Sequence, residues 1–224
     1  MSDDRRRARF EEVAAARLGR VRCALETVHH RHNASAVMRT CDAFGIQRVH
    51  LVGEARFTPS QGTAKGSNRW LDLTSHGDPA DAIRSLKAEG VSIWIADFSP
   101  TALTPAQLPL DKPVCIWFGA EVLGVCEEAR AAADGVVMLP MRGFAQSLNV
   151  SVAAALILRE VSERARSELG ADALLTPSEA RAVVGTWLAR DRLEVVDDTA
   201  QIRAVDALGH AIPDSRDPTP GALP

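Results

Sequence analysis

The sequence lacks several features that would assign it to a common class of protein. No apolar run approaches the ~20 residues that a membrane-spanning helix needs, and the first residues, MSDDRRRARFEE, contain no apolar segment of a secretory signal peptide. Only 4 of the 224 residues are cysteines, and none stands in a CxxC pair. We therefore expect a cytoplasmic protein without membrane contact and without a disulfide framework.

Recognisable cofactor and metal motifs are also missing. The stretch G-A-E-V-L-G at 119–124 does not match the G-x-G-x-x-G fingerprint of dinucleotide-binding folds. The histidine-rich cluster HHRH at 29–32 has no cysteine or carboxylate at a metal-ligand spacing, so we expect no metal and regard RNA contact as the simpler use of these side chains. No internal repeat is present.

The net charge of −3 hides an uneven distribution of charged residues. Residues 1–70 hold 13 Lys/Arg against 7 Asp/Glu, whereas residues 71–224 hold 13 against 22. A polyanionic partner would prefer the basic part of the chain. Composition alone leaves two interpretations open, because an unevenly charged solvated surface gives the same counts and the overall acidity is unlike that of a generic nucleic-acid binder.

Stretches typical of strands alternate with stretches typical of helices. We predict strands at 20–27, 48–52, 71–76, 91–98, 113–119 and 135–140, and helices at 4–19, 33–44, 78–89, 124–134, 149–170 and 177–191. Residues 53–70 form a long polar loop, and the chain after 191 is expected to be poorly ordered. Continuous apolar strands between helices predict an α/β fold whose mostly parallel sheet is covered by helices on both faces. In such sheets ligands usually bind at the carboxyl ends of the strands.

The first of three motifs is HNASAVMRTCDAFG at 32–45. Asn33 can cap the helix, and the i, i+4, i+7 spacing places one stripe of residues in the core and another on the outer side. The inner stripe is Val37, Cys41 and Phe44, and the outer one is Ser35, Arg39 and Asp42. Arg39 is therefore either an ordinary solvated arginine or a phosphate clamp, since a guanidinium fork suits phosphate oxygens.

The second motif, WFGAEVLGVCEEA at 117–129, joins a strand to a helix. Gly119 and Gly124 allow close approach of the backbone to a ligand, and Glu121 lies between them. The carboxylate is either a helix-capping group or a partner for a cationic ligand.

The third motif, GFAQSLNVSVAAALILRE at 143–160, places polar residues before an apolar helix. Asn149 can cap that helix, whose first residues are apolar on nearly every side and therefore predicted to be buried. Gln146 and Ser147 are less well explained by a cap. Buried polar groups at a helix start need partners, which are backbone groups, a ligand or a second subunit.

Together the three motifs resemble those of the SpoU (TrmH-like) branch of the SPOUT superfamily, which comprises RNA 2′-O-ribose methyltransferases. The resemblance covers about residues 20–166. Within the branch, residues 28–45 and 64–76 most resemble the enzymes that methylate guanosine-18 in the tRNA D-loop. The resemblance implies S-adenosylmethionine as methyl donor, tRNA as partner, a deep trefoil knot in the C-terminal part of the fold, and a homodimer with the third-motif helix at its interface.

The resemblance also assigns roles to individual residues. Those expected in catalysis are Arg39, Asn33, Glu121, Ser147 and Asn149. Those expected to bind the cofactor are Ala96, Gly119, Met138, Leu139, Ser147 and Leu148. Because they are basic or can become so, and not because of the resemblance, the residues expected to contact RNA phosphates are Arg5, Arg6, Arg7, Arg9, His32, Lys65 and Arg69. The implied division is a basic N-terminal helical extension at 1–19, a methyltransferase domain at 20–170, and a C-terminal helix with a flexible tail at 171–224.

Three other functions remain open at this level. The same chemistry could act on ribosomal RNA or on another tRNA position. A non-catalytic RNA-binding relative could keep the fold without turnover, although the intact Arg39 argues against it. A different nucleotide-binding enzyme is disfavoured because the glycine-rich fingerprint is missing.

Overall fold

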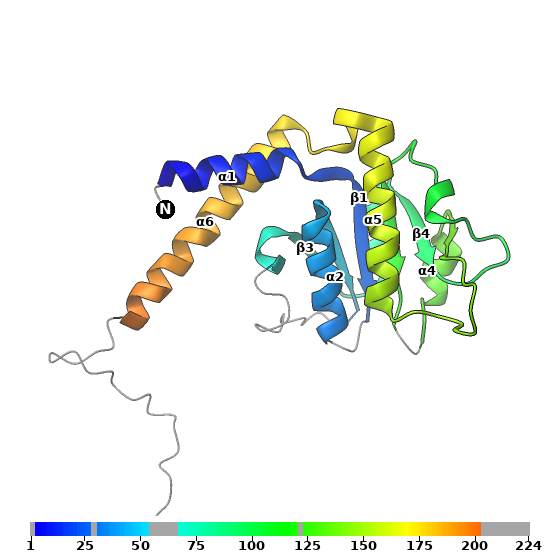
Figure 1. Ribbon diagram of the computed structural model, residues 1–224. Helices are drawn as coiled ribbons and strands as arrows, with labels where there is room; N and C mark the ends of the chain where they lie inside the picture. The colour runs from blue at the N-terminus through cyan, green and yellow to red at the C-terminus, as the bar shows by residue number, and fades with distance from the viewer. Residues whose placement is uncertain (1–2, 28–30, 54–66, 121–122, 203–224) are drawn as a thin grey trace, which may run out of the picture. The chain divides into compact units, whose positions relative to one another are not determined.

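The computed structural model describes residues 3–27, 31–53, 67–120 and 123–202 (Figure 1). The chain forms two compact units, residues 1–184 and residues 185–224. The strands are β1 (Leu18–Glu26), β2 (Ile46–Val52), β3 (Asp72–His76), β4 (Ser92–Ala96), β5 (Val114–Phe118) and β6 (Gly135–Val137). The α-helices are α1 (Asp3–Ala15), α2 (Arg31–Ala43), α3 (Pro79–Ala88), α4 (Glu127–Ala132), α5 (Val150–Leu169) and α6 (Pro177–Ile202). Short 3₁₀ turns are η1 (Ser67–Trp70), η2 (Pro105–Gln107) and η3 (Gly170–Ala173).

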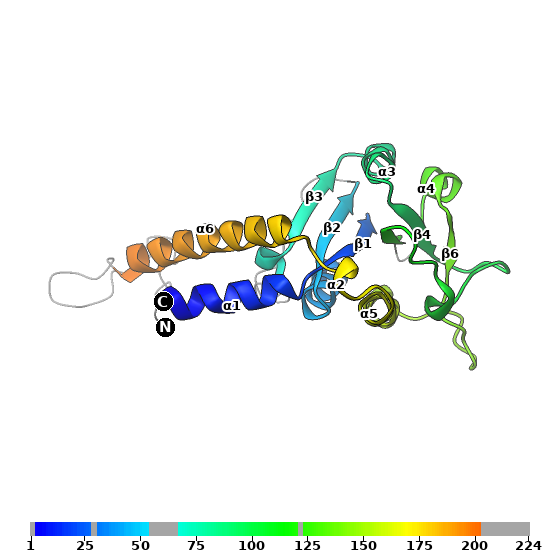
Figure 2. The same ribbon diagram turned by 90° about the horizontal axis from the view of Figure 1, so that it is seen from above.

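The six strands form one sheet in the order β3-β2-β1-β5-β4-β6, and every paired neighbour is parallel. Helices α3 and α4 cover one face of the sheet, and α2 and α5 cover the other (Figure 2). Each face has its own apolar cluster, with Met38 and Leu158 in the one and Leu86 and Trp117 in the other. The predicted α/β fold with a parallel sheet covered on both faces is confirmed.

Several predicted helix ends are confirmed by their capping contacts. The side chain of Asp78 accepts a hydrogen bond from the backbone N of Asp81 (2.8 Å) at the start of α3. The side chain of Asn149 accepts one from the backbone N of Ser151 (2.8 Å) at the start of α5. Gly45 follows α2 with φ +78°, and Gly170 follows α5 with φ +56°. Glycine adopts this left-handed conformation without steric cost.

Two predictions about α2 are wrong. The helix begins at Arg31, so Asn33 lies inside its first turn and is not the N-cap. Ser35 is fully buried, whereas its helical spacing from Arg39 predicted a position on the outer side. The reason is that α2 packs against α5 and η1 as well as β2, so its buried face is wider than one stripe.

The last helix is longer than predicted. Helix α6 continues from Asp191 to Ile202, in a stretch whose composition predicted poor order. The residues RLEVVDDTAQI at 192–202 include neither glycine nor proline, so nothing in them stops a helix. The proline-rich stretch that suggested disorder begins only at Pro213. Residues 203–224 of the predicted tail lie outside the described residues.

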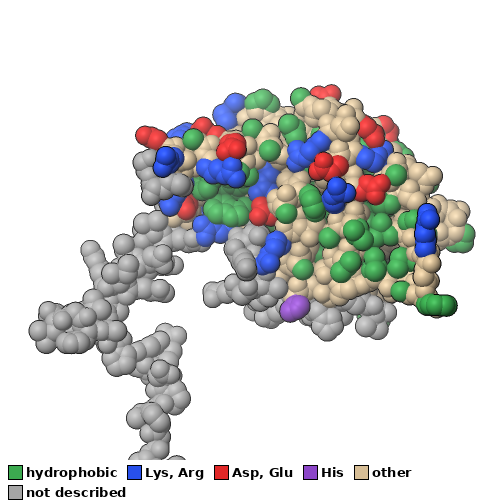
Figure 3. Space-filling view, in the orientation of Figure 1, with side chains coloured by type: hydrophobic (Ala, Val, Ile, Leu, Met, Phe, Trp, Pro, Cys, Tyr) green, Lys and Arg blue, Asp and Glu red, His purple; other side chains and the backbone are tan. Residues whose placement is uncertain are grey.

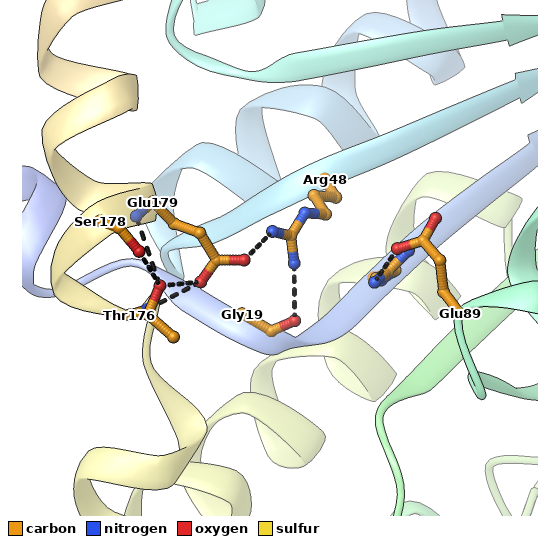
Figure 4. Close-up of polar contacts among 7 residues, drawn as sticks. Gly19, Arg48, Glu89, Thr176, Ser178 and Glu179 are labelled. Carbon is orange, nitrogen blue, oxygen red and sulfur yellow. Dashed lines mark hydrogen bonds and ion pairs between the residues drawn. The ribbon is translucent and has the colours of Figure 1, made fainter.

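A polar clamp fixes the start of α6 to β1 and β2, within the first unit (Figure 4). The Oε2 of Glu179 accepts hydrogen bonds from the backbone N and the hydroxyl of Thr176, both at 2.7 Å. Its Oε1 lies 2.5 Å from Nη2 of Arg48, whose Nη1 donates to the carbonyl of Gly19 (3.1 Å). The clamp therefore joins β1, β2 and the first turn of α6.

A buried chain of imidazoles lies between β2, β3 and α3. The Nδ1 of His50 and the Nε2 of His76 are 3.0 Å apart, and the Nδ1 of His76 is 3.0 Å from Oδ2 of Asp81. Both histidines are buried. Burial, together with the nearby Arg22 guanidinium, lowers the pKa of His50 from 6.5 to about 4. His50 is therefore neutral at physiological pH.

Candidate active site

A cavity of about 610 Å³ opens at the carboxyl ends of β4, β5 and β6. This volume lies in the range of sites for small ligands and cofactors. Its walls are formed by the end of β4, the turn after β5, the end of β6, and the loop that leads into α5, together with residues of α4 and α5. The lining residues are Ala96, Asp97, Phe98, Phe118, Gly119, Ala120, Leu123, Gly124, Val125, Arg130, Val137, Met138, Leu139, Met141, Ser147, Leu148, Asn149, Val150, Ala153 and Ile157.

The turn after β5 is tight, and it explains the two glycines of the second motif. The backbone groups of Ala120 and Gly124 exchange hydrogen bonds of 3.0 and 2.9 Å. A Cβ on Gly119 would lie 2.3 Å from the carbonyl carbon of Gly124, which has φ +69°. The close approach that requires glycine at 119 is therefore to the chain's own backbone. Glu121, predicted in this turn, lies outside the described residues.

An ion pair contributes the charged groups of the cavity wall. The Nη2 of Arg130, on α4, contacts Oδ2 of Asp97, directly after β4. The Nε of Arg130 donates to the carbonyl of Val125 (3.1 Å). Neither Asp97 nor Arg130 was predicted as a site residue. The position of Asp97 directly after an apolar strand is the signal that could have identified it, because parallel strands bring ligand-binding groups to their carboxyl ends.

Asn149 connects the third motif to the first. Its Oδ1 accepts hydrogen bonds from the backbone N (2.8 Å) and the hydroxyl (2.6 Å) of Ser151. Its Nδ2 donates to Oδ1 of Asn33 (3.3 Å) in the first turn of α2. The predicted cap is thus confirmed, and the same side chain joins the cavity to the helix that carries Arg39.

The structure brings most of the predicted cofactor and catalytic residues together. Those that line the cavity are Ala96, Gly119, Met138, Leu139, Ser147, Leu148 and Asn149. Asn33 lies beside them through Asn149. Arg39 is exposed on α2 and is not among the residues of the cavity wall. The roles assigned to these residues remain predictions.

Comparison with known proteins identifies the family. Residues 20–159 match the model of the SpoU rRNA Methylase family. The chain is 40% identical over 185 residues to the tRNA (guanosine(18)-2′-O)-methyltransferase of Thermus thermophilus, covering 82% of this chain and 95% of that protein. The crystal structure of the A. aeolicus TrmH/SpoU tRNA modifying enzyme superposes with a TM-score of 0.76 at 30% identity, covering 84% and 97% of the two chains.

The chain belongs to the SpoU rRNA methylase family. A further solved structure, the AdoMet-bound rRNA methyltransferase from Sinorhizobium meliloti, is 26% identical with a TM-score of 0.60 and covers 71% of this chain and 60% of that one. The matched segment, residues 20–159, contains the three motifs apart from Glu160 and the whole cavity wall.

The basic residues of this SpoU-family chain that were predicted to contact RNA lie on three elements. Arg5, Arg6, Arg7 and Arg9 lie on α1, where Arg7 pairs with Glu11 (3.1 Å) and Arg9 with Glu12 (2.7 Å). His32 is exposed on α2, and the guanidinium of Arg69 lies 4.3 Å from the ring centroid of Trp70 in η1. Lys65 lies outside the described residues.

An aromatic contact links two of these elements. The rings of Phe10 on α1 and Trp70 on η1 have centroids 5.4 Å apart. The basic helix and the basic end of the long loop are therefore held together in this SpoU-family chain. Within the described ranges, no helix is long and apolar enough to span a membrane, and no cluster of three His, Cys, Asp or Glu side chains could hold a metal ion.

Proposed function

We propose that this chain transfers a methyl group from S-adenosylmethionine to the ribose 2′-hydroxyl of guanosine-18 in the D-loop of tRNA. The observation that carries the proposal is the 40% identity, over 95% of its length, to a relative named for that reaction. The match to a tRNA modifying enzyme over 97% of its chain supports the same substrate class. Such an enzyme would act in the cytoplasm.

The cavity fits S-adenosylmethionine in size and in chemistry. Phe118, Leu139 and Leu148 provide apolar walls for a flat heterocycle. The Asp97 carboxylate gives the cavity a negative group toward a cationic ligand, although Arg130 offsets part of that charge. Ser147 supplies a hydroxyl for polar contacts on the loop before α5. When bound, the cofactor supplies an electrophilic methyl group on a positively charged sulfur.

Arg39 is the residue we assign to the substrate side of the reaction. A guanidinium stays protonated, so it does not act as a general base. We infer that it holds the phosphate of the guanosine and stabilises the negative charge that develops on the 2′-oxygen. The bound cofactor would supply the methyl group to the 2′-oxygen, and the phosphate held by Arg39 would accept the hydroxyl proton. Positioning of the two reactants supplies a large part of the acceleration.

Asn33 and Asn149 fix the position of the substrate side of the site relative to the cofactor cavity. Their hydrogen bond connects α2, which carries Arg39, to the start of α5 at the cavity wall. We assign Ser147 to contacts with cofactor and substrate, and Glu121 to support of the turn after β5. The basic residues of α1, together with His32, Lys65 and Arg69, would bind phosphates along the tRNA.

We also propose that the chain forms the trefoil knot and the homodimer of its family. In support of the knot, the cavity wall is made by successive segments of the later part of the matched domain, the ends of β4, β5 and β6 and the start of α5. In support of the dimer, Leu148, Val152 and Leu156 recur every four residues with 37%, 47% and 47% exposure. In the space-filling view, hydrophobic side chains gather over α5 and beside it (Figure 3).

The exposed stripe corrects one expectation about α5. Its first residues are not buried on every side within one chain, because Val152 and Leu156 face outward while Ala154, Ile157 and Leu158 face the core. Residues four apart share one helix face, so the outward residues form a continuous apolar surface. We propose that the chain comprises an N-terminal extension at 1–19, a catalytic domain at 20–170 and a C-terminal part at 171–224.

The test is to incubate the purified protein with labelled S-adenosylmethionine and, in separate reactions, a tRNA transcript or ribosomal RNA, then map the methylated nucleotide. The expected product is a 2′-O-methyl group at guanosine-18. A transcript with that guanosine replaced is the control and should accept no label. Labelling of ribosomal RNA in preference to tRNA, or equal labelling of the control transcript, would contradict the proposed substrate.

A further inference from the structure

One buried carboxylate at the carboxyl end of β1 lies outside the three sequence motifs. Glu26 is the last residue of β1 and is 7% exposed. Its Oε2 accepts a hydrogen bond from the indole Nε1 of Trp117 (2.7 Å). The backbone N of Cys126 donates to both oxygens, at 3.1 Å to Oε1 and 3.3 Å to Oε2. Among the residues that the structure describes, no ion pair involves Glu26.

The two donors lie on either side of the turn that lines the cavity. Trp117 directly precedes Phe118 and Gly119, and Cys126 directly follows Val125. Residues 118–120 and 123–125 all belong to the cavity wall. Both ends of this segment are therefore tied to a single carboxylate. Glu26 is not in the wall itself, so any influence on a ligand acts through the turn.

The contact suits a carboxylate at this position, because both of its oxygens accept hydrogen bonds. Both partners are N–H donors, and a carboxylate offers an accepting oxygen to each of them. A glutamine of the same length would place an amide NH₂ against one of the two donors. Burial raises the penalty for such a mismatch, because a buried polar group without a partner loses its hydrogen bonds to water.

Cys126 extends the contact into α4. It is the N-cap of that helix, and its Sγ lies 3.4 Å from the backbone N of Ala129. Burial raises the pKa of the Cys126 thiol to about 11, so the side chain stays a neutral cap near pH 7. Helix α4 also carries Arg130, which pairs with Asp97 in the cavity wall. Glu26 therefore anchors the turn and the start of the helix that follows it.

We propose that Glu26 is a positioning residue for S-adenosylmethionine: it holds the two ends of the turn, residues 118–120 and 123–125, in the arrangement that binds the cofactor. The inference rests on the proposed function, since it takes the cavity as the cofactor site. It goes beyond that function by assigning cofactor affinity to a residue that does not touch the cavity. The effect is geometric and separate from RNA binding.

The experiment compares the full-length protein with Glu26→Gln. We expect the dissociation constant for S-adenosylmethionine, measured by calorimetry, to rise about tenfold, because one hydrogen bond at the turn is replaced by a donor–donor contact. The dissociation constant for tRNA and the turnover rate at saturating cofactor should stay within about twofold. If the substitution instead destabilised the whole protein, the affinities for tRNA and for S-adenosylmethionine would fall together.

Glu127→Gln is the matched control. Glu127 is exposed on α4, directly after Cys126, and its substitution removes the same charge. Cofactor affinity should stay within about twofold of the unmodified protein. An equal loss in both variants would mean that charge, and not the geometry of the turn, is responsible, and would overturn the proposal.

A measurement on the unmodified protein covers the case in which Glu26→Gln does not fold. Amide hydrogen exchange at Cys126 reports the contact directly, and added S-adenosylmethionine should slow that exchange by about tenfold or more. Unchanged exchange at Cys126 in the presence of bound cofactor would overturn the proposal. If the unmodified protein bound no S-adenosylmethionine at all, the proposed function itself would fail, which is a distinguishable result.

Discussion

The side chain of Asn149 donates a hydrogen bond to Oδ1 of Asn33 across 3.3 Å and at the same time caps α5. Two residues 116 positions apart in the sequence are thereby joined where the first and third motifs meet. The cap uses the Oδ1 of Asn149, and the link between the motifs uses its Nδ2. Substitutions can therefore separate the structural role from the proposed catalytic one.

Asn149→Asp should keep the cap and lose the link. A carboxylate accepts from the backbone N of Ser151 as the amide does, but it has no N–H to donate to Asn33. We expect an unchanged melting temperature and a methylation rate reduced by about tenfold or more. Asn149→Ala, which also loses the cap, should in addition be destabilised by about 1 kcal/mol. A full rate for Asn149→Asp would remove the link from the mechanism.

Arg39→Lys tests whether the guanidinium acts through its geometry or only through its charge. Lysine keeps the positive charge and loses the two-pronged fork that suits phosphate. Since Arg39 is exposed on α2, stability should be unaffected, while turnover should fall by about tenfold or more. Arg84→Lys, on α3 at the other face of the sheet, should leave the rate unchanged. Near-full activity of Arg39→Lys would contradict the positioning role.

Those elements of the fold that depend on a local sequence pattern could be predicted from the sequence. The apolar runs SIWIA and VCIWF identified β4 and β5, and Asp78 and Asn149 marked two helix starts. The order of the strands in the sheet could not be predicted from the sequence. Strand β1 pairs with β5 although β2, β3 and β4 lie between them in the chain, and no periodicity of the sequence reveals that pairing. Ser35 shows the same limit, since its burial depends on how α2 packs against other elements.

The site was predictable where a motif was contiguous and unpredictable where it was assembled by the fold. Met138, Leu139, Ser147 and Leu148 were expected around one cavity, and they line it. Asp97 and Arg130 are 33 positions apart, and Glu26 and Trp117 are 91 apart. Such pairs become neighbours only through the parallel pairing of β1, β4 and β5, so no local pattern could indicate them.

Binding of tRNA should depend steeply on salt. Each phosphate neutralised by a basic side chain contributes about one unit to the slope of log K against log salt concentration, or slightly less. Arg5→Gln and Arg69→Gln should each weaken binding and lower that slope by about one unit. The measurement is filter binding or fluorescence anisotropy over a salt series, with Arg84→Gln as the control. A slope that neither substitution changes would exclude both side chains from the RNA interface.

The outward stripe of α5 should be the contact between two copies of the chain. Val152→Glu places a charge in the middle of this apolar surface, and a buried unpaired charge is strongly unfavourable at an interface. Sedimentation equilibrium should show a dimer for the unmodified protein and a monomer for the variant. Ala80→Glu adds the same charge at an exposed position on α3 and should remain dimeric. A dimer that survives Val152→Glu would place the interface elsewhere.

His50 should make the stability of the protein fall in mild acid. Its pKa is about 4 in the folded state, because of burial and the nearby Arg22, against 6.5 when unfolded. Between pH 4 and 6.5 the unfolded chain therefore binds more protons than the folded chain. The contribution of neutral His50 to the free energy of unfolding is complete above pH 6.5 and is lost as the pH falls toward 4. Between about pH 7.5 and 5.5 we expect a loss of about 1 kcal/mol in the free energy of unfolding.

His50→Gln isolates this contribution from the protonation of carboxylates. Glutamine has no charge at any of these pH values, so the variant should be less stable at about pH 7.5 through loss of the His76 contact, but its stability should fall less between about pH 7.5 and 5.5. Urea unfolding at the two pH values gives both quantities. His32→Gln, at an exposed position on α2, provides the comparison. If the variant and the unmodified protein lost equal stability over this range, proton uptake by the buried imidazole would not be the cause.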